Sequence, residues 1–561
     1  MNNHPQKKPD NYLRITPLGG MGEIGKNLTV FETRRDIIIV DCGFAFPDSS
    51  MLGIDFVLPD ITYLKNKKRL IRGIFVTHGH EDHKGAIPYL LNEMGNPPIF
   101  ATKLTQGLIS VNLKEKKLLD SATLKILRPR QEIKLGDFSI EPFRVNHSIP
   151  DAVGFAINTP LGTVVHTGDF KFDYTSPEGH TDIARLGELG AQGVMLLMSD
   201  STNSENPGYT MPEKGVIQTI ENVFTQAKGR IIVASFSTNL NRIQQIIDVA
   251  AKYGRKVCIN GRSMINNVNI AIELGYIKAP KGVLAPIDKA RSIQPNKLVI
   301  ISTGSQGETY SVLWRLAKGI NRQFKITKGD TIVVSASPIP GNEESVYSTI
   351  NDLFRLGAEV IYNKTLDVHV SGHACQEEQK MMLSLTKPKY FFPIHGEYRH
   401  QVYHCRTAVD MGIPEENTFI LENGHTLEIT PGQAKQDKSG YVKDIYIDGS
   451  GIGDIGSVVI KDRQVMSEAG IFIATVIVKK NTGDLLGTPE ILSRGFVYMK
   501  ESQDLVKEAK QLVIDCVNKF QRGNNKPDAI KLRGELKSKL RDFFYEKTER
   551  EPMVMPMVIE V

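Results

Sequence analysis

Short apolar runs separated by turn residues fill the first third of the chain. Between residue 13 and about residue 200 these runs are LRITPLGG, NLTVFET, DIIIVDCG, GIFVTH, PPIFAT, FSIEPFRV, TVVHTGD and GVMLLMSD. Few segments in this region have helical periodicity, the clearest being residues 85–94 and 105–119. Many short strands with occasional helices predict sheets packed on each other and covered on the outside by helices.

After about residue 205 the pattern changes to a regular alternation of strand and helix. The strands are RIIVAS, KVCIN, KLVIIS and TIVVSA, and the helical segments are residues 241–253, 264–274, 308–318 and 343–356. This alternation is typical of βαβ units on a parallel sheet. Strand-like segments then continue to about residue 449.

A glycine-rich stretch, DGSGIGDIGS at residues 448–457, predicts a linker. Beyond it lie the strand IFIATVIV, two helical segments and the closing PMVMPMVIEV. In the last helix Leu532, Leu536, Leu540 and Phe543 recur at helical spacing, so this stripe is expected to be core.

Length and composition narrow the class of protein. A chain of 561 residues suggests about three domains, and 40% apolar with 24% charged residues is ordinary for a globular protein. The excess of 69 basic over 63 acidic residues, a net charge of +6, is weak evidence for an anionic partner. The chain has no apolar run of eighteen residues and its N-terminus has no apolar stretch, so neither a membrane span nor a secretory signal is expected.

The five cysteines are scattered and odd in number, without CxxC spacing. They are Cys42, Cys258, Cys375, Cys405 and Cys516. This pattern indicates reduced thiols in a cytoplasmic protein rather than a disulfide framework or a cysteine zinc site.

The candidate chemistry begins with THGHEDH, residues 77–83, directly behind the apolar run at residues 74–76. Such a cluster could hold a metal, hold a phosphate or form a solvated turn. Three imidazoles this close would repel one another on protonation unless a positive ion held them together, and neutral imidazole and carboxylate suit zinc, iron and manganese. Further histidines follow apolar segments: His147, His166 (just before Gly168 and Asp169), His369, His373 and His395.

These motifs together resemble a known family. HxHxDH, a later lone His, an Asp after a Gly and a last His are similar to the metallo-β-lactamase fold. The strand-helix insert, HVSGHA (369–374) and PIHGEYR (393–399) resemble the β-CASP branch of nucleases. SDSTNS (199–204), GRSM (261–264), TGSQGE (303–308), SPIPGNE (337–343) and SRGFVY (493–498) resemble bacterial ribonuclease J, over nearly the whole chain.

The resemblance implies an α/β chain with an αββα metallo-β-lactamase fold, an inserted β-CASP domain with a parallel sheet, and a small C-terminal α/β domain. The expected boundaries are residues 1–205 and 369–449 for the two segments of the lactamase-like domain and 206–368 for the β-CASP domain. Residues 450–460 are expected to be a linker and 461–561 the C-terminal domain.

The resemblance also implies two divalent ions per chain, Zn²⁺ or Mn²⁺, with Mg²⁺ as an optional activator. The first ion would be held by His78, His80 and His147, the second by Asp82, His83 and His395, with Asp169 as a bridge. Asp41 matches an acid that orients the histidines. All seven ligands are present, whereas some paralogous subunits of this family have degraded metal motifs.

The same resemblance gives the remaining site residues. The candidate catalytic groups are Asp82, Asp200 and His373. His373 would donate a proton or stabilise charge in the transition state. Asp200 would face the metals or orient their ligands, and the alternative for Asp200 is a residue that only caps a helix or turn. The candidate substrate-binding residues are Ser237, Thr238, Asn239, His369, Val370, Ser371, Gly372 and His373. Residues 236–239 read FSTN where relatives commonly read FASN, which alters the shape of this loop.

The implied function is hydrolysis of RNA phosphodiester bonds in RNA maturation and mRNA decay. The expected activity is that of a 5′-to-3′ exonuclease, and an additional endonuclease activity is left open. Single-stranded, 5′-monophosphorylated RNA is the expected substrate. The expected assembly is a homodimer or homotetramer, or a hetero-oligomer with a paralogous subunit, and an RNA helicase or the ribosome are candidate partners. The alternatives are a small-molecule metallohydrolase and a non-catalytic RNA-binding subunit of a degradation complex.

Overall fold

The computed structural model describes residues 11–48, 50–176, 179–305, 311–336, 343–363, 365–449, 451–497, 502–523 and 528–561. Most of the SPIPGNE motif, the second half of TGSQGE and the last residue of SRGFVY lie outside these ranges. The chain forms two compact units, Met1–Asp48 with Phe56–Ile445, and Ser49–Asp55 with Tyr446–Val561.

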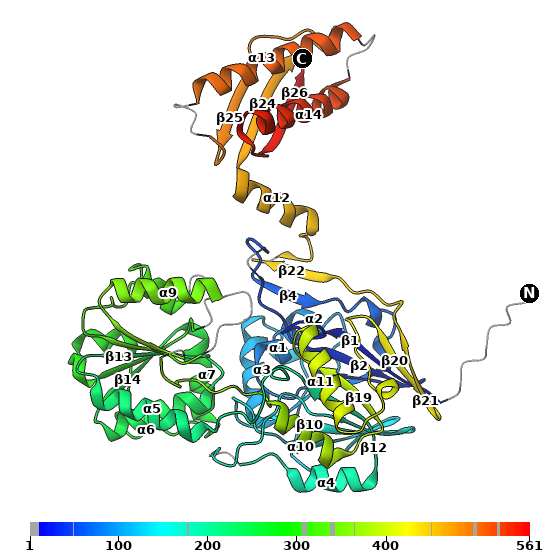
Figure 1. The fold of residues 1–561 in the computed structure, drawn as a ribbon, viewed down its shortest axis with the longest axis vertical. Helices are drawn as coiled ribbons and strands as arrows, with labels where there is room; N and C mark the ends of the chain where they lie inside the picture. Colours follow the sequence, from blue (N-terminus) through cyan, green and yellow to red (C-terminus); the bar gives the residue numbers. More distant parts are fainter. Residues whose placement is uncertain are drawn as a thin grey trace, which may run out of the picture. The chain divides into compact units, whose positions relative to one another are not determined.

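Two packed sheets form the lactamase-like part of the first unit (Figure 1). The eight-stranded sheet has the order β21-β20-β1-β2-β3-β5-β6-β7. Its strands are β1 (Leu13–Gly19), β2 (Leu28–Glu32), β3 (Ile37–Val40), β5 (Ile71–Phe75), β6 (Ile99–Ala101), β7 (Leu124–Ile126), β20 (Thr426–Thr430) and β21 (Gln433–Asp437). The six-stranded sheet has the order β19-β12-β11-β10-β9-β8. Its strands are β8 (Ile133–Leu135), β9 (Phe138–Arg144), β10 (Val153–Thr159), β11 (Gly162–His166), β12 (Val194–Asp200) and β19 (Tyr390–Ile394).

Both sheets are covered by helices on their outer faces, which completes the αββα fold expected from the sequence. Facing side chains such as Phe31, Phe75, Phe155 and Phe392 fill the space between the sheets. The outer face of the six-stranded sheet is covered by α4 (Ile183–Gln192), α10 (Gln376–Thr386) and α11 (Tyr398–Asp410). On the other side α3 (Lys103–Glu115) packs on β6 and β7.

The helix expected at residues 85–94 is instead two four-residue helices, α1 (Glu81–Lys84) and α2 (Ile87–Leu90). The first of them begins inside the histidine motif. A side chain on Gly85 would collide with the ring of Phe44. The break therefore lies where the aromatic side chain of a neighbouring loop meets the helix.

The β-CASP part is a six-stranded parallel sheet in the order β15-β14-β16-β13-β17-β18, as the strand-helix alternation predicted. Its strands are β13 (Ile231–Ala234), β14 (Lys256–Asn260), β15 (Leu284–Ala285), β16 (Leu298–Ser302), β17 (Thr331–Val334) and β18 (Glu359–Tyr362). One face, with Ile231 and Val233, packs on α5 (Glu213–Gln226), α6 (Leu240–Lys252) and α7 (Arg262–Glu273). The other face, with Ile232 and Ala234, packs on α8 (Val312–Ala317) and α9 (Glu343–Arg355).

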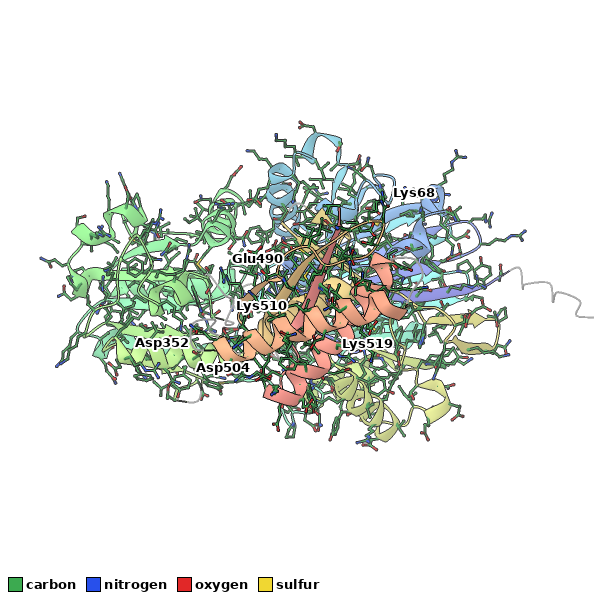
Figure 2. All side chains as sticks on the ribbon, turned by 90° about the horizontal axis from the view of Figure 1, so that it is seen from above. Lys68, Asp352, Glu490, Asp504, Lys510 and Lys519 are labelled. Carbon is green, nitrogen blue, oxygen red and sulfur yellow. The ribbon has the colours of Figure 1, made fainter. Side chains whose placement is uncertain are left out.

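A second, smaller core forms the C-terminal unit. It consists of the sheet β25-β24-β26 and two helices packed on one face of that sheet. These elements are β24 (Ile471–Val478), β25 (Glu490–Arg494), β26 (Met553–Glu560), α13 (Gln503–Gly523) and α14 (Ala529–Thr548). Charged positions of this unit such as Glu490, Asp504 and Lys519 are exposed (Figure 2).

Two expectations for this unit differ in detail. Helix α12 (Ser457–Ala469) begins inside the segment expected to be a linker, because no glycine or proline interrupts residues 457–469. The buried stripe of α14 continues from Leu540 to Phe544, while Phe543 is only partly buried, because an i+4 step keeps Phe544 on the inner face.

The smaller strands β4 (Phe56–Pro59), β22 (Asp444–Asp448) and β23 (Gly451–Ile452) and six short 3₁₀ segments complete the described elements. The 3₁₀ segments are Thr62–Leu64, Lys68–Leu70, Leu119–Ser121, Ile287–Ser292, Pro295–Lys297 and Glu415–Asn417. None of the helices in the described ranges combines the length and the apolar character that a membrane-spanning helix needs.

Candidate dinuclear metal centre

The candidate metal ligands lie where strands of both sheets end. β5 leads into His78 and His80, and the short helix α1 then carries Asp82 and His83. From the other sheet, His147 follows β9, Asp169 follows β11 and His395 follows β19. The edges of two packed sheets therefore meet at one place, and chain segments more than 300 residues apart contribute to it.

The backbone at these strand ends is bent into unusual conformations. His395 has φ of 55° and Asp41, directly after β3, has φ of 63°. Residues other than glycine adopt this left-handed region at a cost of order 1–3 kcal/mol, which the surrounding fold must offset, and such residues cluster at functional sites. Gly43 allows a close approach here, since a side chain at this position would overlap the Asp82 carbonyl.

The first group of ligand atoms comes from three histidines. His80 Nδ1 lies 3.0 Å from His78 Nε2 and 3.1 Å from His147 Nε2. Asp169 Oδ2 is 3.6 Å from His78 Nε2 and 3.7 Å from His147 Nε2. These four atoms converge as the ligands of one ion would.

The second group shares the same aspartate. Asp169 Oδ2 lies 3.2 Å from His83 Nε2 and 3.9 Å from His395 Nε2. Asp82 Oδ2 lies 3.4 Å from His83 Nε2 and 3.2 Å from His395 Nε2. In a tetrahedral zinc site with bonds of about 2.0–2.1 Å, ligand atoms stand roughly 3.3 Å apart, so both groups fit a divalent ion.

Hydrogen bonds on the far side of the rings set the tautomers that a metal needs. His83 Nδ1 lies 2.7 Å from Asp41 Oδ2, and His147 Nδ1 lies 2.8 Å from the Gly372 carbonyl oxygen. Both oxygens only accept, so each Nδ1 carries the proton and each Nε2 presents a lone pair to its group.

Asp41 also acts on the histidine motif through Thr77. Its Oδ1 accepts from the Thr77 backbone N–H at 2.8 Å, and the Thr77 hydroxyl lies 3.0 Å from Asp41 Oδ2 and 3.0 Å from His78 Nδ1. Thr77 was not singled out from the sequence, although it opens the THGHEDH motif and is fully buried.

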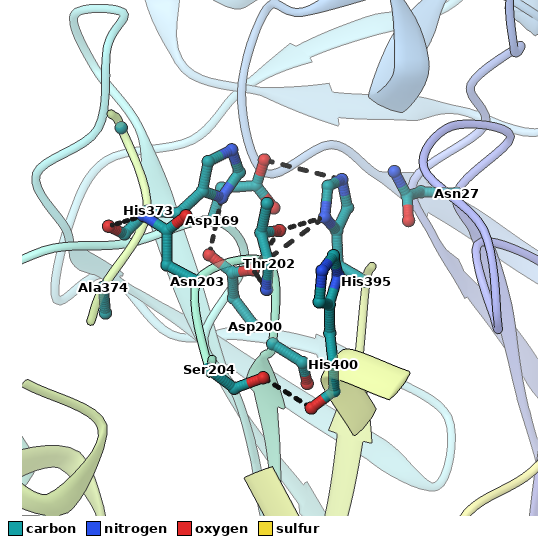
Figure 3. Close-up of polar contacts among 12 residues, drawn as sticks. Asn27, Asp169, Asp200, Thr202, Asn203, Ser204, His373, Ala374, His395 and His400 are labelled. Carbon is teal, nitrogen blue, oxygen red and sulfur yellow. Dashed lines mark hydrogen bonds and ion pairs between the residues drawn. The ribbon is translucent and has the colours of Figure 1, made fainter. Parts of the chain in front are cut away.

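Asp200 and His373 form a pair beside the second group (Figure 3). His373 Nδ1 lies 2.7 Å from Asp200 Oδ2, and the ring of His373 stacks on that of His395 with centroids 5.4 Å apart. Burial lowers the pKa of His373, but the carboxylates of Asp200, Asp169 and Asp82 together outweigh it and raise the pKa to about 9. Asp169, Asp200, His373 and His395 also bring ligand atoms within 4.8 Å of one another.

The HVSGH loop is built onto the lactamase-like part. Gly372 must lack a side chain, because a Cβ there would lie 2.5 Å from His147 Cε1. Ser371 Oγ accepts from Asn203 Nδ2 at 2.8 Å and from the His373 backbone N–H at 3.2 Å. Asn203 and its neighbour Thr202 lie within the quoted SDSTNS motif, yet their roles depend on contacts that the sequence does not show.

The other candidate substrate-binding residues differ in what their side chains contact. Asn239 caps helix α6, its Oδ1 accepting from the Arg242 backbone N–H at 3.1 Å, and Thr238 is buried. Val370 is a core residue, and His369 Nδ1 is buried without a hydrogen-bond partner. The Ser237 carbonyl and hydroxyl oxygens face Asn267 Nδ2 at 3.1 and 3.4 Å.

Known protein families match the chain along most of its length. Residues 36–221 match the beta-lactamase superfamily domain and residues 360–420 the Zn-dependent metallo-hydrolase RNA specificity domain. Residues 228–353 match the ribonuclease J beta-CASP domain and residues 458–561 the ribonuclease J C-terminal domain. With the fold and the two ligand groups, these matches define a metallo-hydrolase of the β-lactamase superfamily with a β-CASP insert.

Individual relatives show which metallo-hydrolases with a β-CASP insert the chain resembles in sequence over its full length. The chain is 44% identical to ribonuclease J 1 of Streptococcus pyogenes, covering 98% of both chains. It is 41% identical to ribonuclease J of Thermus thermophilus, covering 99% of this chain and 96% of the relative. It is 40% identical to ribonuclease J2 of Bacillus subtilis, covering 99% of this chain and 100% of the relative. A solved protein of unknown function from Enterococcus faecalis, 18% identical, shares the fold over 74% of this chain and 100% of its own, with a TM-score of 0.55.

The chain belongs to the ribonuclease J family. It is a metal-dependent ribonuclease that binds and hydrolyses RNA and uses divalent metal. The small-molecule hydrolase and the non-catalytic scaffold considered above are thereby set aside.

Proposed function

We propose that the enzyme holds two Zn²⁺ or Mn²⁺ ions through the seven ligands named from the sequence and degrades single-stranded RNA from its 5′ end. The observation that carries this proposal is the shared Asp169 Oδ2, which lies 3.2–3.9 Å from four histidine nitrogens in two groups. A carboxylate oxygen placed between two sets of lone pairs is suited to bridging two cations.

When bound, two such ions supply Lewis acidity and lower the pKa of a water molecule that attacks phosphorus. The protein side chains position the ligands and set the charge of the site. Asp41 and Thr77 hold the histidine rings in place, and Asp82 adds negative charge to the second group.

His373 is proposed as the proton donor to the leaving oxygen. Its Nδ1 is engaged by Asp200, which leaves Nε2 as the atom that can reach substrate. Asp200 favours the protonated ring, so that a proton is available when the bond to the leaving oxygen breaks. Asp200 therefore acts through His373 and not on RNA.

Ser371 is proposed to contact the RNA phosphate at the 5′ end. Because its oxygen already accepts two N–H groups, its hydroxyl hydrogen remains for an outside acceptor. Ser237, on the loop after β13, would add a second hydroxyl. Two neutral hydroxyl donors offset little negative charge, so we expect this site to favour a terminal monophosphate over the more highly charged triphosphate.

The test compares two RNAs of one sequence, each labelled once at each end, that carry a 5′-monophosphate or a 5′-triphosphate. We expect the monophosphorylated RNA to be degraded to mononucleotides much faster, and Ser237→Trp to abolish this preference while any internal cleavage persists. Equal decay of the two RNAs, or shortening from the 3′ end, would contradict the proposed direction.

The C-terminal unit is proposed to join two copies of the chain into a dimer, from which a tetramer could be built, in the cytoplasm. One face of its sheet carries α13 and α14, whereas the opposite face exposes Ile477, Leu492, Met555, Met557 and Ile559 at 40–48%. Alternating apolar residues on an uncovered sheet face are suited to pairing with an identical face.

A further inference from the structure

The loop after β12 contains a hydroxyl that touches both the candidate metal ligands and the candidate acid. Thr202 Oγ1 lies 2.7 Å from His395 Nδ1 and 2.7 Å from Asp200 Oδ1. The Thr202 backbone N–H also donates to Asp200 Oδ1 at 3.0 Å. Figure 3 shows Thr202 between Asp200 and His395, with His373 on the other side of Asp200.

The direction of these hydrogen bonds follows from the groups involved. Asp200 Oδ1 already accepts the Thr202 backbone N–H and its Oδ2 faces His373 Nδ1, so both oxygens are used as acceptors and the single hydroxyl hydrogen of Thr202 points to Asp200. The oxygen of Thr202 must then accept from His395 Nδ1–H. This places the ring proton on Nδ1 and leaves the lone pair of His395 Nε2 directed at Asp82 and Asp169, 3.2 and 3.9 Å away.

We propose that Thr202 is a positioning residue that couples the second metal site to the pair formed by Asp200 and His373. Its hydroxyl fixes the tautomer of His395 and, through the same atom, holds Asp200 in the orientation in which Oδ2 bonds His373. The inference rests on His395 being a ligand, as proposed above. It adds that one side chain, itself no ligand, orients both His395 in the second metal site and Asp200 in the pair with His373.

The histidines of the first group have other supports. His147 Nδ1 donates to the Gly372 carbonyl, and His78 Nδ1 contacts Thr77. Loss of the Thr202 hydroxyl should therefore weaken the second ion and leave the affinity for the first unchanged. A general structural defect would not make that distinction.

The experiment titrates the metal-stripped enzyme with Zn²⁺ by calorimetry and measures kcat and KM on 5′-monophosphorylated RNA for Thr202→Val and Thr202→Ser. Valine keeps the shape and removes the hydroxyl, whereas serine keeps the hydroxyl. We expect Thr202→Val to raise the dissociation constant of the second ion about 10- to 100-fold and to lower kcat with little change in KM, and Thr202→Ser to restore both.

Thr386→Val is the control for removing a hydroxyl elsewhere in the same unit: Thr386 is fully buried, whereas Thr202 is partly buried, and the Thr386 hydroxyl donates to the Met382 carbonyl oxygen in helix α10. It should leave both ions in place. If Thr202→Val does not fold, the comparison is made with Thr202→Ala. Normal binding of both ions with normal kcat in the hydroxyl-free variant, or a serine variant as defective as valine, would overturn the inference. His395→Ala is measured in parallel. If this variant still binds the second ion, His395 is not a ligand and the proposed metal site is wrong. If His395→Ala loses the second ion but Thr202→Val keeps it, only the role of Thr202 is refuted.

Discussion

Gly372→Ala should impair catalysis through a steric conflict with His147, a proposed metal ligand. The added Cβ would lie 2.5 Å from His147 Cε1 and 2.6 Å from His147 Nδ1. Non-bonded carbon atoms favour a separation of about 3.5 Å, so the ring and the HVSGH loop must move apart by about 1 Å. The Gly372 carbonyl also accepts the proton of His147 Nδ1, so the same movement strains that hydrogen bond.

A displacement of about 1 Å at a catalytic centre can cost about 100-fold in rate, equivalent to about 2.7 kcal/mol of transition-state stabilisation. We therefore expect kcat of Gly372→Ala to fall by about two orders of magnitude, and the first ion to bind more weakly. The assay is steady-state cleavage of RNA combined with elemental analysis of the purified variant.

Gly187→Ala provides the control for adding a methyl group. Gly187 lies within helix α4, and a Cβ there would meet nothing within 4 Å. This variant should keep its activity and gain about 0.5–1 kcal/mol in unfolding free energy. Wild-type turnover and metal content in a folded Gly372→Ala enzyme would refute the argument from close packing.

Further variants test the bridging role of Asp169, the support of the HVSGH loop and the role of the C-terminal unit. Asp169→Asn should lose both ions and activity together, and elemental analysis that still finds two ions with normal turnover would remove the bridging assignment. Asn203→Asp cannot donate to Ser371 Oγ or to the His373 carbonyl, so unfolding free energy measured with denaturant should fall by about 1–3 kcal/mol, and an unchanged value would show that these bonds contribute nothing net. Truncation before Ser457 should give a smaller assembly by light scattering, and an unchanged mass would show that the C-terminal unit does not join subunits.

A stability prediction concerns the buried pair of Arg242 and Glu213, whose Nη2 and Oε2 lie 2.8 Å apart. Burial raises the pKa of Glu213, but Arg242 and Lys171 outweigh it and hold this pKa below its ordinary value. The contribution of Glu213 is therefore present at neutral pH and is lost as pH falls through its lowered pKa. Arg242→Met should cost about 3–5 kcal/mol at pH 7 and less in acid, and a cost independent of pH would contradict this.

The sequence predicted those parts of the site that depend on local order. THGHEDH follows an apolar strand, and its candidate ligands lie together at the end of that strand. The parallel sheet was equally evident, since Ile231 to Ala234 and the strands beside it are apolar on both faces. Resemblance to a family, rather than spacing, named the distant His147 and His395.

What the sequence could not show are contacts between segments far apart in the chain. Thr202 meets His395 across 193 positions and Asn203 meets Ser371 across 168, so nothing local indicates either pairing. Asn239 and Val370 belong to quoted motifs, yet one caps a helix and the other fills a core. A motif therefore identifies a functional loop without separating the residues that face substrate from those that hold the loop.

We propose that RNA hydrolysis depends on two metal ions, held by two ligand groups that share Asp169. The most direct measurement adds Mn²⁺ or Zn²⁺ stepwise to metal-stripped enzyme and follows release of mononucleotides from 5′-labelled RNA beside the number of ions bound. We expect no hydrolysis without metal and full activity at two ions per chain. RNA hydrolysis by the metal-free enzyme, or full activity with a single ion bound, would contradict it.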